Sequence, residues 1–268
     1  MKKLSKLTII ALVFVFFSLA SGFTAEKGSK VVVIMYHGIV ENNKNRNTYV
    51  ITPAELEKDI QYLINNGYEI LTCEDLLSGT KGKKRLNKTA VLTFDDGFYG
   101  NYKFAVPLFK KYNISGVFAV VGCYAFNKKL TDKNSIFAYM DWDDIKNASR
   151  YVEIASHTYD MHELKGRKGV SKNQNETIDE YLSAIKQDFN KNHKYITKYC
   201  KEPVTFAYPY GIYNKYTEQV LKDMGYKITL TCNEGINYVT NEDSLRLLKR
   251  FNRDGKMSSM EFMKKYKI

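Results

Sequence analysis

Several residue patterns that mark common catalytic and structural sites are missing from this sequence. Its four cysteines, Cys73, Cys123, Cys200 and Cys232, are far apart and form no Cys-x-x-Cys pair, which argues against a thiolate zinc site and a dithiol redox pair. Neither a Gly-x-Ser-x-Gly elbow nor a His-Glu-x-x-His helix is present, so a serine esterase and a zincin-type protease are both disfavoured. Four cysteines allow three disulfide pairings, and the sequence leaves these pairings and unpaired thiols open.

Acidic residues are scarce relative to basic ones. The 268-residue chain has 29 Asp and Glu against 41 Lys and Arg, a formal charge of +12. Such a charge can attract a protein to an anionic cell envelope or to nucleic acid. The lysines are dispersed, with one basic cluster at residues 81–85, and no nucleic-acid-binding signature accompanies them. We therefore expect an anionic envelope as a partner, no nucleic acid and no obligate protein partner.

Long hydrophobic runs are confined to the N-terminus. Three lysines precede an apolar run over residues 7–20, and small residues follow it, which is the order of a secretory signal. The run has about 14 residues, fewer than the ~20 that a membrane-spanning helix needs. We predict a signal peptide over 1–22, a short linker over 23–29 and a secreted domain over 30–268. An uncleaved anchor on the outer face of the membrane is the alternative.

The rest of the chain alternates between strand-like and helix-like segments. Apolar, β-favouring stretches cover residues 31–36, 68–72, 90–94, 116–121, 151–156, 205–208, 227–231 and 245–249. Helical periodicity covers residues 53–66, 74–77, 102–112, 141–149, 175–199, 213–224 and 259–266. About seven β/α units without an internal repeat or linker predict a parallel α/β barrel, complete or incomplete, in a single domain. An open doubly wound sheet is the alternative.

Unusual polar residues follow several of the predicted strands. His37, the pair Asp95 and Asp96, and His157 each come directly after an apolar stretch, as does the run 208–211. Because the carboxyl ends of parallel strands open on one face of a barrel, we expect these residues to meet there. Adjacent residues of an extended chain point to opposite faces, so one aspartate can bind a cation while the other serves as a base.

Two histidines, His157 and His162, lie five residues apart after one predicted strand. Two imidazoles in a loop can bind one ion, and an aspartate from another strand can supply a third ligand. Two His and one Asp leave coordination positions open for water and substrate, which is typical of a catalytic metal site. The set predicts one divalent metal, Zn²⁺ first, with Co²⁺, Ni²⁺ and Fe²⁺ as alternatives.

Residues 93–97, 156–162 and 206–211 resemble the ordered motifs of the polysaccharide deacetylases, carbohydrate esterase family 4, also called the NodB-homology domain. The resemblance covers nearly the whole chain after the predicted signal. It implies a distorted parallel (β/α)7-type barrel, in agreement with the number of β/α units.

The resemblance also implies roles for individual residues. Asp95 matches the catalytic base of the family, and Asp96, His157 and His162 match its three metal ligands. The implied chemistry is hydrolysis of an N-acetyl amide by metal-activated water, with a proton taken up by the base and another returned to the leaving amine.

Some features depart from the commonest family pattern. The histidine pair is one residue further apart than usual, and a Tyr36-His37 motif stands at the first strand. With the run 208–211, these features resemble the branch that acts on poly-N-acetylglucosamine. The arginine of the usual third motif is absent, and no histidine follows His193 to supply the usual late acid. The resemblance to that branch implies His37 as the replacement acid.

The implied substrate is an acetylated cell-surface polysaccharide, either poly-N-acetylglucosamine or peptidoglycan. The segment expected at the substrate and the oxyanion consists of Tyr208, Pro209, Tyr210 and Gly211. The backbone N–H of Tyr210 is the implied oxyanion donor. Arg250 is expected to line the cleft, and Trp142 is expected either to form a wall for the sugar or to be a core residue.

Two other functional classes stay open at this point. A metal-independent glycoside hydrolase would use Asp95 with a distant acid. A catalytically inactive wall-binding protein would also fit the positive charge. Release of acetate rather than of reducing ends distinguishes a deacetylase from both.

Overall fold

The computed structural model describes residues 28–163 and 166–268. Its strands are β1 (Ser29–Tyr36), β2 (Gly38–Ile39), β3 (Val50–Ile51), β4 (Glu69–Leu71), β5 (Thr89–Phe94), β6 (Val117–Val120), β7 (Glu153–Ser156), β8 (Thr205–Ala207), β9 (Ile228–Leu230), β10 (Asn237–Val239) and β11 (Phe251–Asn252). The predicted export signal and most of the predicted linker lie outside the described residues.

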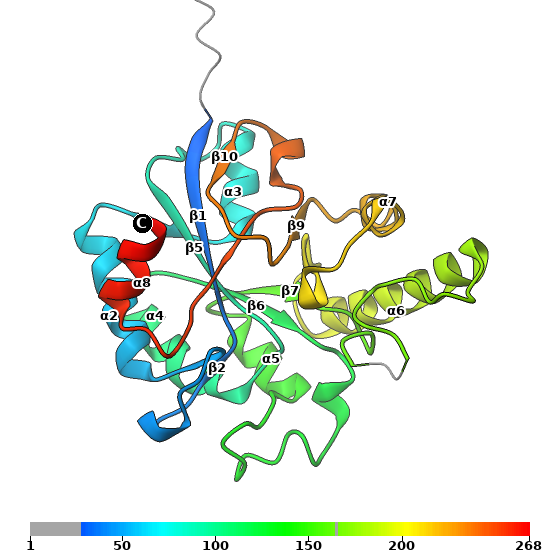
Figure 1. Cartoon of the computed structure of the whole chain (residues 1–268), viewed down its shortest axis with the longest axis horizontal. Coiled ribbons are helices and arrows are strands. Elements are labelled where there is room, and N and C mark those ends of the chain that lie inside the picture. The colour runs from blue at the N-terminus through cyan, green and yellow to red at the C-terminus, as the bar shows by residue number, and fades with distance from the viewer. Residues whose placement is uncertain (1–27, 164–165) are drawn as a thin grey trace, which may run out of the picture.

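The main sheet is mostly parallel and curls into a half-barrel (Figure 1). Its strand order is β10-β1-β5-β6-β7-β8-β9, with β11 also pairing with β1 and β4 with β5. All of these pairings are parallel except that of β10 with β1. The short strands β2 and β3 pair separately. The prediction of a distorted (β/α)7-type barrel in one domain is therefore confirmed.

Helices flank the sheet. They are α2 (Pro53–Asn65), α3 (Cys73–Thr80), α4 (Val106–Tyr112), α5 (Trp142–Ala148), α6 (Ile178–Tyr199), α7 (Lys215–Asp223) and α8 (Ser259–Tyr266). Short 3₁₀ turns and one π-helical turn complete the elements, at Asn43–Asn45, Asn101–Ala105, Tyr124–Phe126, Pro209–Gly211 and Glu242–Leu245. The end of α6 that begins at Ile178 extends furthest from the rest of the molecule (Figure 1).

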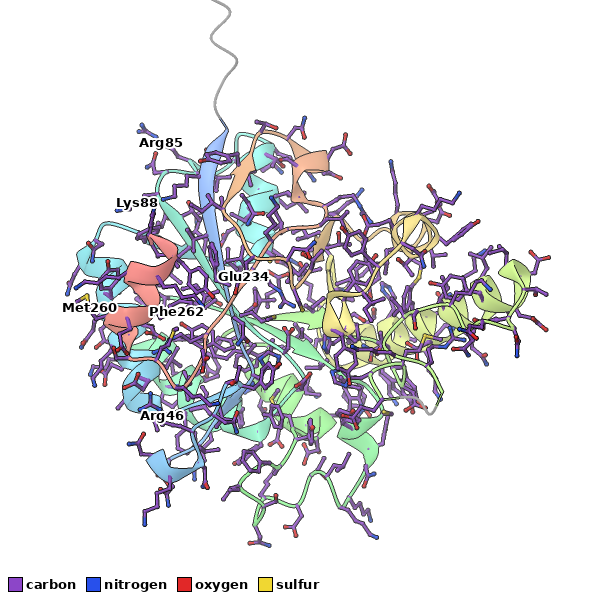
Figure 2. All side chains as sticks on the ribbon, viewed as in Figure 1. Arg46, Arg85, Lys88, Glu234, Met260 and Phe262 are labelled. Carbon is purple, nitrogen blue, oxygen red and sulfur yellow. The ribbon has the colours of Figure 1, made fainter. Side chains whose placement is uncertain are left out.

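The sequence specifies where the helices begin. Thr52 caps α2 by accepting a hydrogen bond from the backbone of Glu55, and Pro53 occupies the first turn, as predicted. Burial then selects the inward face of each helix. On α8, Phe262 is fully buried against the core, whereas Met260 points outward and is 51% exposed (Figure 2).

Alternate residues of the central strands serve two different layers. Val31 and Val33 of β1, with Val91 of β5, belong to a cluster that fills the inside of the curl. Val32 of β1 and Leu92 of β5 instead pack beneath the surrounding helices. All five side chains are fully buried, and each contributes about 1.5–3 kcal/mol to folding. Period-two alternation thus builds both layers from continuous apolar runs.

The last predicted strand differs from the structure. Residues 245–249 form no strand: Leu247 has φ 56°, and only Leu248 bridges to Leu230 of β9. The left-handed backbone at Leu247 interrupts the extended conformation that a strand requires. The chain becomes a strand only at β11, where it pairs with β1.

All four cysteines lie in the described part of the chain, and each is unpaired. Of the alternatives that the sequence left open, disulfides or unpaired thiols, the structure has unpaired thiols. Over residues 28–163 and 166–268, no helix combines the length and the apolar character that crossing a membrane requires.

Candidate active site

A cavity of about 610 Å³ opens at the carboxyl ends of the parallel strands. Residues that follow β1, β5 and β7 reach it, because parallel strands all end on the same side of the sheet. The predicted site residues that line it are His37, Asp95, Asp96, His157, His162 and Tyr210. The structure therefore brings together six polar or aromatic residues that are spread over more than 170 positions of the sequence.

The two adjacent aspartates both face this cavity. Asp95 continues the inward-facing series of β5 that includes Val91 and Thr93. Simple alternation would turn Asp96 to the opposite face. Instead Asp96 has φ 71° and Gly97 has φ 81°, so the left-handed turn ends the alternation. Aspartate tolerates this backbone region better than most residues do.

Three potential metal ligands converge beside this turn. Asp96, His157 and His162 each offer one ligand atom, and these atoms lie within 4.8 Å of one another. Oδ1 of Asp96 is 3.4 Å from Nε2 of His157 and 3.1 Å from Nε2 of His162. This buried oxygen nevertheless has no partner in hydrogen-bond geometry among the described residues.

The environment of His157 fixes which of its nitrogens faces the cluster as an acceptor. Its Nδ1 lies 2.8 Å from the carbonyl oxygen of Ala207, which can only accept, so Nδ1 carries the proton. In the neutral ring, Nε2 then directs a lone pair at the carboxylate of Asp96. Two acceptors at this distance need a positive charge between them. A divalent cation fits this donor set, and a carbonyl behind the ring is the usual way to orient a ligating histidine.

Electrostatics favours the charged forms of these groups. Burial would raise the pKa of Asp96, but its contacts with His157 and His162 hold that pKa far below the usual range. Burial would lower the pKa of His157, yet Asp96 and Asp95 raise it above the ordinary value. A proton and a metal ion therefore compete for the same position.

Asp95 is held by a buried arginine rather than by the metal-ligand set. Oδ1 and Oδ2 of Asp95 accept hydrogen bonds from the two terminal nitrogens of Arg250, both at 2.8 Å. Arg250 is fully buried, and its Nε donates to the carbonyl of Thr231 at 2.7 Å. Burial would raise the pKa of Asp95, but Arg250 and then His157 lower it below its ordinary value. Asp95 is consequently ionised and fixed in orientation.

This contact corrects the expectation that Arg250 lines the cleft. The guanidinium lies beneath Asp95 and is not part of the cavity wall. Its two terminal nitrogens fix the orientation of the Asp95 carboxylate.

His37 lies on the wall of the cavity next to Tyr49, whose ring centre is 4.9 Å from the imidazole centre in an edge-on arrangement. Burial lowers the pKa of His37 more than Asp96 and Asp95 raise it. Its Nδ1 has no hydrogen-bond partner within the described residues. The ring is therefore neutral near pH 7.

The Tyr208–Gly211 segment divides between the core and the cavity. Tyr208 is fully buried and donates a 2.6 Å hydrogen bond to Glu218. Tyr210 has φ 57°, is 47% exposed and places its ring 5.0 Å from that of His162. Pro209 is buried and Gly211 approaches Cys232, so these two residues shape the turn and do not line the cavity.

Comparison with known proteins identifies the family. A sequence model of the polysaccharide deacetylases matches residues 82–229, more than half of the chain. The chain belongs to the polysaccharide deacetylase family. It is 30% identical over 212 residues to YxkH of Bacillus subtilis (strain 168), which covers 78% of this chain and 67% of that protein. The family that the motifs resemble is thereby confirmed.

Two further relatives are informative. The chain is 26% identical over 246 residues to the poly-beta-1,6-N-acetyl-D-glucosamine N-deacetylase of Escherichia coli (strain K12), covering 80% of this chain but 35% of that protein. A de-N-acetylase structure from Aggregatibacter actinomycetemcomitans has a TM-score of 0.72 at 24% identity and covers 87% of this chain and all of that one. The second likeness supports the half-barrel fold of this family member.

Trp142 does not face the cavity of this family member. The indole is 5% exposed and packs among Phe126, Tyr195 and Tyr199, with ring centres 5.2–5.7 Å away. Of the two expectations for Trp142, the sugar-facing wall is therefore wrong and the core residue is right. As the first residue of α5 it is directed toward α6, whose aromatic residues supply the larger apolar surface.

Sequence reasoning missed two polar residues near the site, Asp188 and Asn192 of α6. Both are buried and hydrogen-bonded to the chain around His157. A signal was present: they occupy the same helical face as the buried Ile185, Phe189 and Ile196. A carboxylate on an otherwise apolar face needs a specific partner.

Proposed function

We propose that this chain is a secreted, metal-dependent N-deacetylase that acts on N-acetylglucosamine units of a cell-surface polysaccharide. Family membership supports an acetylated polysaccharide as the substrate. The Escherichia coli relative supports poly-N-acetylglucosamine, and peptidoglycan carries the same acetamide chemistry. Because the chain spans only 35% of that relative, the choice of polymer belongs to the proposal.

The observation that carries the proposal is the convergence of unpaired acceptors in the cavity. Oδ1 of Asp96 is buried without a hydrogen bond, and His157, whose Nδ1 faces the carbonyl of Ala207, turns Nε2 toward it. When bound there, a divalent cation supplies Lewis acidity, which lowers the pKa of water and polarises an amide carbonyl. Zn²⁺ suits two histidines and one carboxylate, and Co²⁺, Ni²⁺ and Fe²⁺ also fit.

The remaining residues then take distinct roles. Asp95, ionised and held by Arg250, accepts the proton of the attacking water. His37, neutral in the free protein, takes up a proton in the substrate complex and returns it to the leaving amine, and its lowered pKa makes the protonated ring a strong donor. The backbone N–H of Tyr210, in the left-handed turn beside His162, stabilises the developing oxyanion.

We further propose that residues 1–22 direct export and that residues 30–268 form the catalytic domain. The lysine-led apolar run supports export. Removing residues 1–22 takes away three lysines and leaves a formal charge of +9. This charge would attract the domain to an anionic envelope.

Paired substitutions test the roles of the two aspartates. Asp95→Asn should keep a full metal complement and lose about 10²–10⁴-fold in turnover. Asp96→Asn should lose metal affinity first and regain part of its activity in excess metal. Metal content by elemental analysis and acetate release from a panel of acetylated glycans provide the readouts.

The outcomes separate the proposal from its competitors. If Asp95→Asn is the metal-deficient variant, the two roles must be exchanged. If the protein releases reducing ends but no acetate, and a chelator does not slow this release, the protein is a glycoside hydrolase. Glycan binding without any product would identify a binding protein.

A further inference from the structure

The segment between His157 and His162 is held firmly along one edge by the preceding β/α loop. The carbonyl of Thr158 accepts a 3.1 Å hydrogen bond from the backbone of Gly122, and that of Tyr159 accepts one of 2.8 Å from Cys123. These bonds tie the segment to the chain that follows β6. They satisfy carbonyls only and leave the backbone N–H groups on the other edge to be satisfied elsewhere.

A single carboxylate from α6 satisfies that other edge. Oδ1 of Asp188 accepts from the backbone N–H of Tyr159, and Oδ2 accepts from that of Asp160, both at 2.8 Å. Asp188 is only 8% exposed. No lysine, arginine or histidine in residues 28–163 and 166–268 forms an ion pair with it. The backbone N–H groups are therefore the main compensation for burying this charge.

One helical turn further along, Asn192 fixes the start of the same segment. Its Nδ2 donates to Oγ of Ser156 at 2.9 Å and to the carbonyl of Val120 at 3.1 Å. Asn192 is fully buried. Residues four apart on a helix lie on one face, so α6 contacts both the end of β7 and the segment that follows it.

The backbone held in this way is strained. Thr158, directly after His157, has φ 71° and is fully buried. For a β-branched residue this left-handed conformation is a true outlier, and such strain persists only where the surroundings over-determine it. The two hydrogen bonds to Asp188 follow immediately after the strained residue. They are well placed to keep the segment in the conformation that returns His162 toward Asp96.

We propose that Asp188 is the positioning residue of the metal site. Through the backbone of Tyr159 and Asp160, it sets the separation and direction of His157 and His162. Asp188 is not one of the three potential ligands and does not line the cavity. The inference rests on the proposed function, because Asp188 can position metal ligands only if His157, His162 and Asp96 bind a cation.

The test compares Asp188→Asn with a matched control on the same helix, Asp179→Asn. Both changes remove one negative charge, but Asp179 is exposed in the first turn of α6. Asn keeps the size of the side chain and replaces one acceptor with a donor that faces a backbone N–H. Zn²⁺ affinity is measured on each metal-free folded protein by competition with a chromophoric chelator. Far-UV circular dichroism and thermal unfolding of the metal-free proteins report the fold.

Asp188→Asn should bind Zn²⁺ roughly 10–100-fold more weakly than the wild type, the usual effect of removing a residue that orients a metal ligand. Asp179→Asn should bind as the wild type does. Excess Zn²⁺ should restore most of the kcat for acetate release in Asp188→Asn. Asp188→Glu keeps both acceptor oxygens and should recover part of the affinity, and it replaces Asp188→Asn in the comparison if the latter does not fold.

The contrary results are equally specific. A less stable Asp188→Asn with unchanged Zn²⁺ affinity would reduce Asp188 to a structural residue and overturn the inference. Where Asp188→Asn does not fold, an Asp188→Glu variant that folds and binds Zn²⁺ as tightly as the wild type would do the same. Failure of the wild type itself to bind Zn²⁺, Co²⁺, Ni²⁺ or Fe²⁺ would instead overturn the proposed function.

Discussion

The buried pair of Arg250 and Asp95 allows a prediction whose size follows from the structure. The side chains are 0% and 3% exposed, and both carboxylate oxygens are bonded to the guanidinium. Arg250→Met would leave the carboxylate buried without its main counter-charge. Removing one partner of such a pair costs about 3–5 kcal/mol of folding stability.

The same substitution should change the pH dependence of activity. Burial raises the pKa of Asp95 and Arg250 is the main factor that lowers it, so without Arg250 the pKa must rise. A base acts only when ionised. The acidic limb of the kcat/KM profile should therefore move to higher pH in Arg250→Met. Arg250→Lys keeps a charge but loses the two-pronged geometry, so its limb should lie between those of the wild type and Arg250→Met.

The assay is acetate release across pH at saturating metal, together with denaturant unfolding. Arg246→Met is the matched control, because Arg246 pairs with Glu218 at 2.7 Å outside the cavity wall. That control should lose some stability without moving the acidic limb. A second check is the double variant Arg250→Met/Asp95→Asn, which should be less destabilised than the sum of its parts. An unmoved acidic limb in an active Arg250→Met protein would refute the proposed link between Arg250 and the base.

Three further predictions concern other parts of the chain. Burial raises the pKa of Glu153 to about 7 from the ordinary 4.5. As pH rises between these values, the unfolded chain loses the Glu153 proton while the folded chain keeps it, so the free energy of unfolding should fall. In Glu153→Gln, thermal unfolding should show a smaller loss of stability over this pH range. An unchanged slope of stability against pH would contradict the raised pKa of Glu153. Tyr49 lines the cavity and is 56% exposed, so Tyr49→Ala should raise KM roughly 2–10-fold with kcat nearly unchanged; a lower kcat alone would show that Tyr49 acts through His37. Mass spectrometry of the native protein should find a mature N-terminus near Ser21 or Phe23, whereas an intact Met1 would indicate an anchor.

The sequence predicts the layout of the site because its polar residues follow apolar strands. His37, Asp96 and His157 reach one cavity simply because parallel strands end on one side of a sheet. What alternation could not predict is that both aspartates face the same space. That result depends on the left-handed backbone at Asp96, with φ 71°, and the alternation of apolar and polar residues does not predict this conformation.

Residues that act through other residues were harder to find. Asp188 and Asn192 are separated from His157 by more than 30 positions and meet it only because α6 packs on β7. Their polarity on a buried helical face was visible in the sequence, but their partners are backbone groups, which have no sequence signature of their own. For Trp142 the residue itself was noticed but its location was not predicted. A single tryptophan in a sequence is compatible with both a sugar-binding wall and an aromatic core until its neighbours in space are known.

The misplaced last strand and the misassigned arginine have one physical cause. A strand over residues 245–249 would place Arg250 just past its end, among the side chains that open into the cleft. Instead, the backbone of Leu247 donates to Oγ1 of Thr229 at 2.7 Å in a left-handed conformation. Leucine has no intrinsic preference for that region, so the contact with β9 imposes it and local propensity gives no warning. After this turn, Arg250 passes inward beneath Asp95, where its guanidinium donates to both carboxylate oxygens.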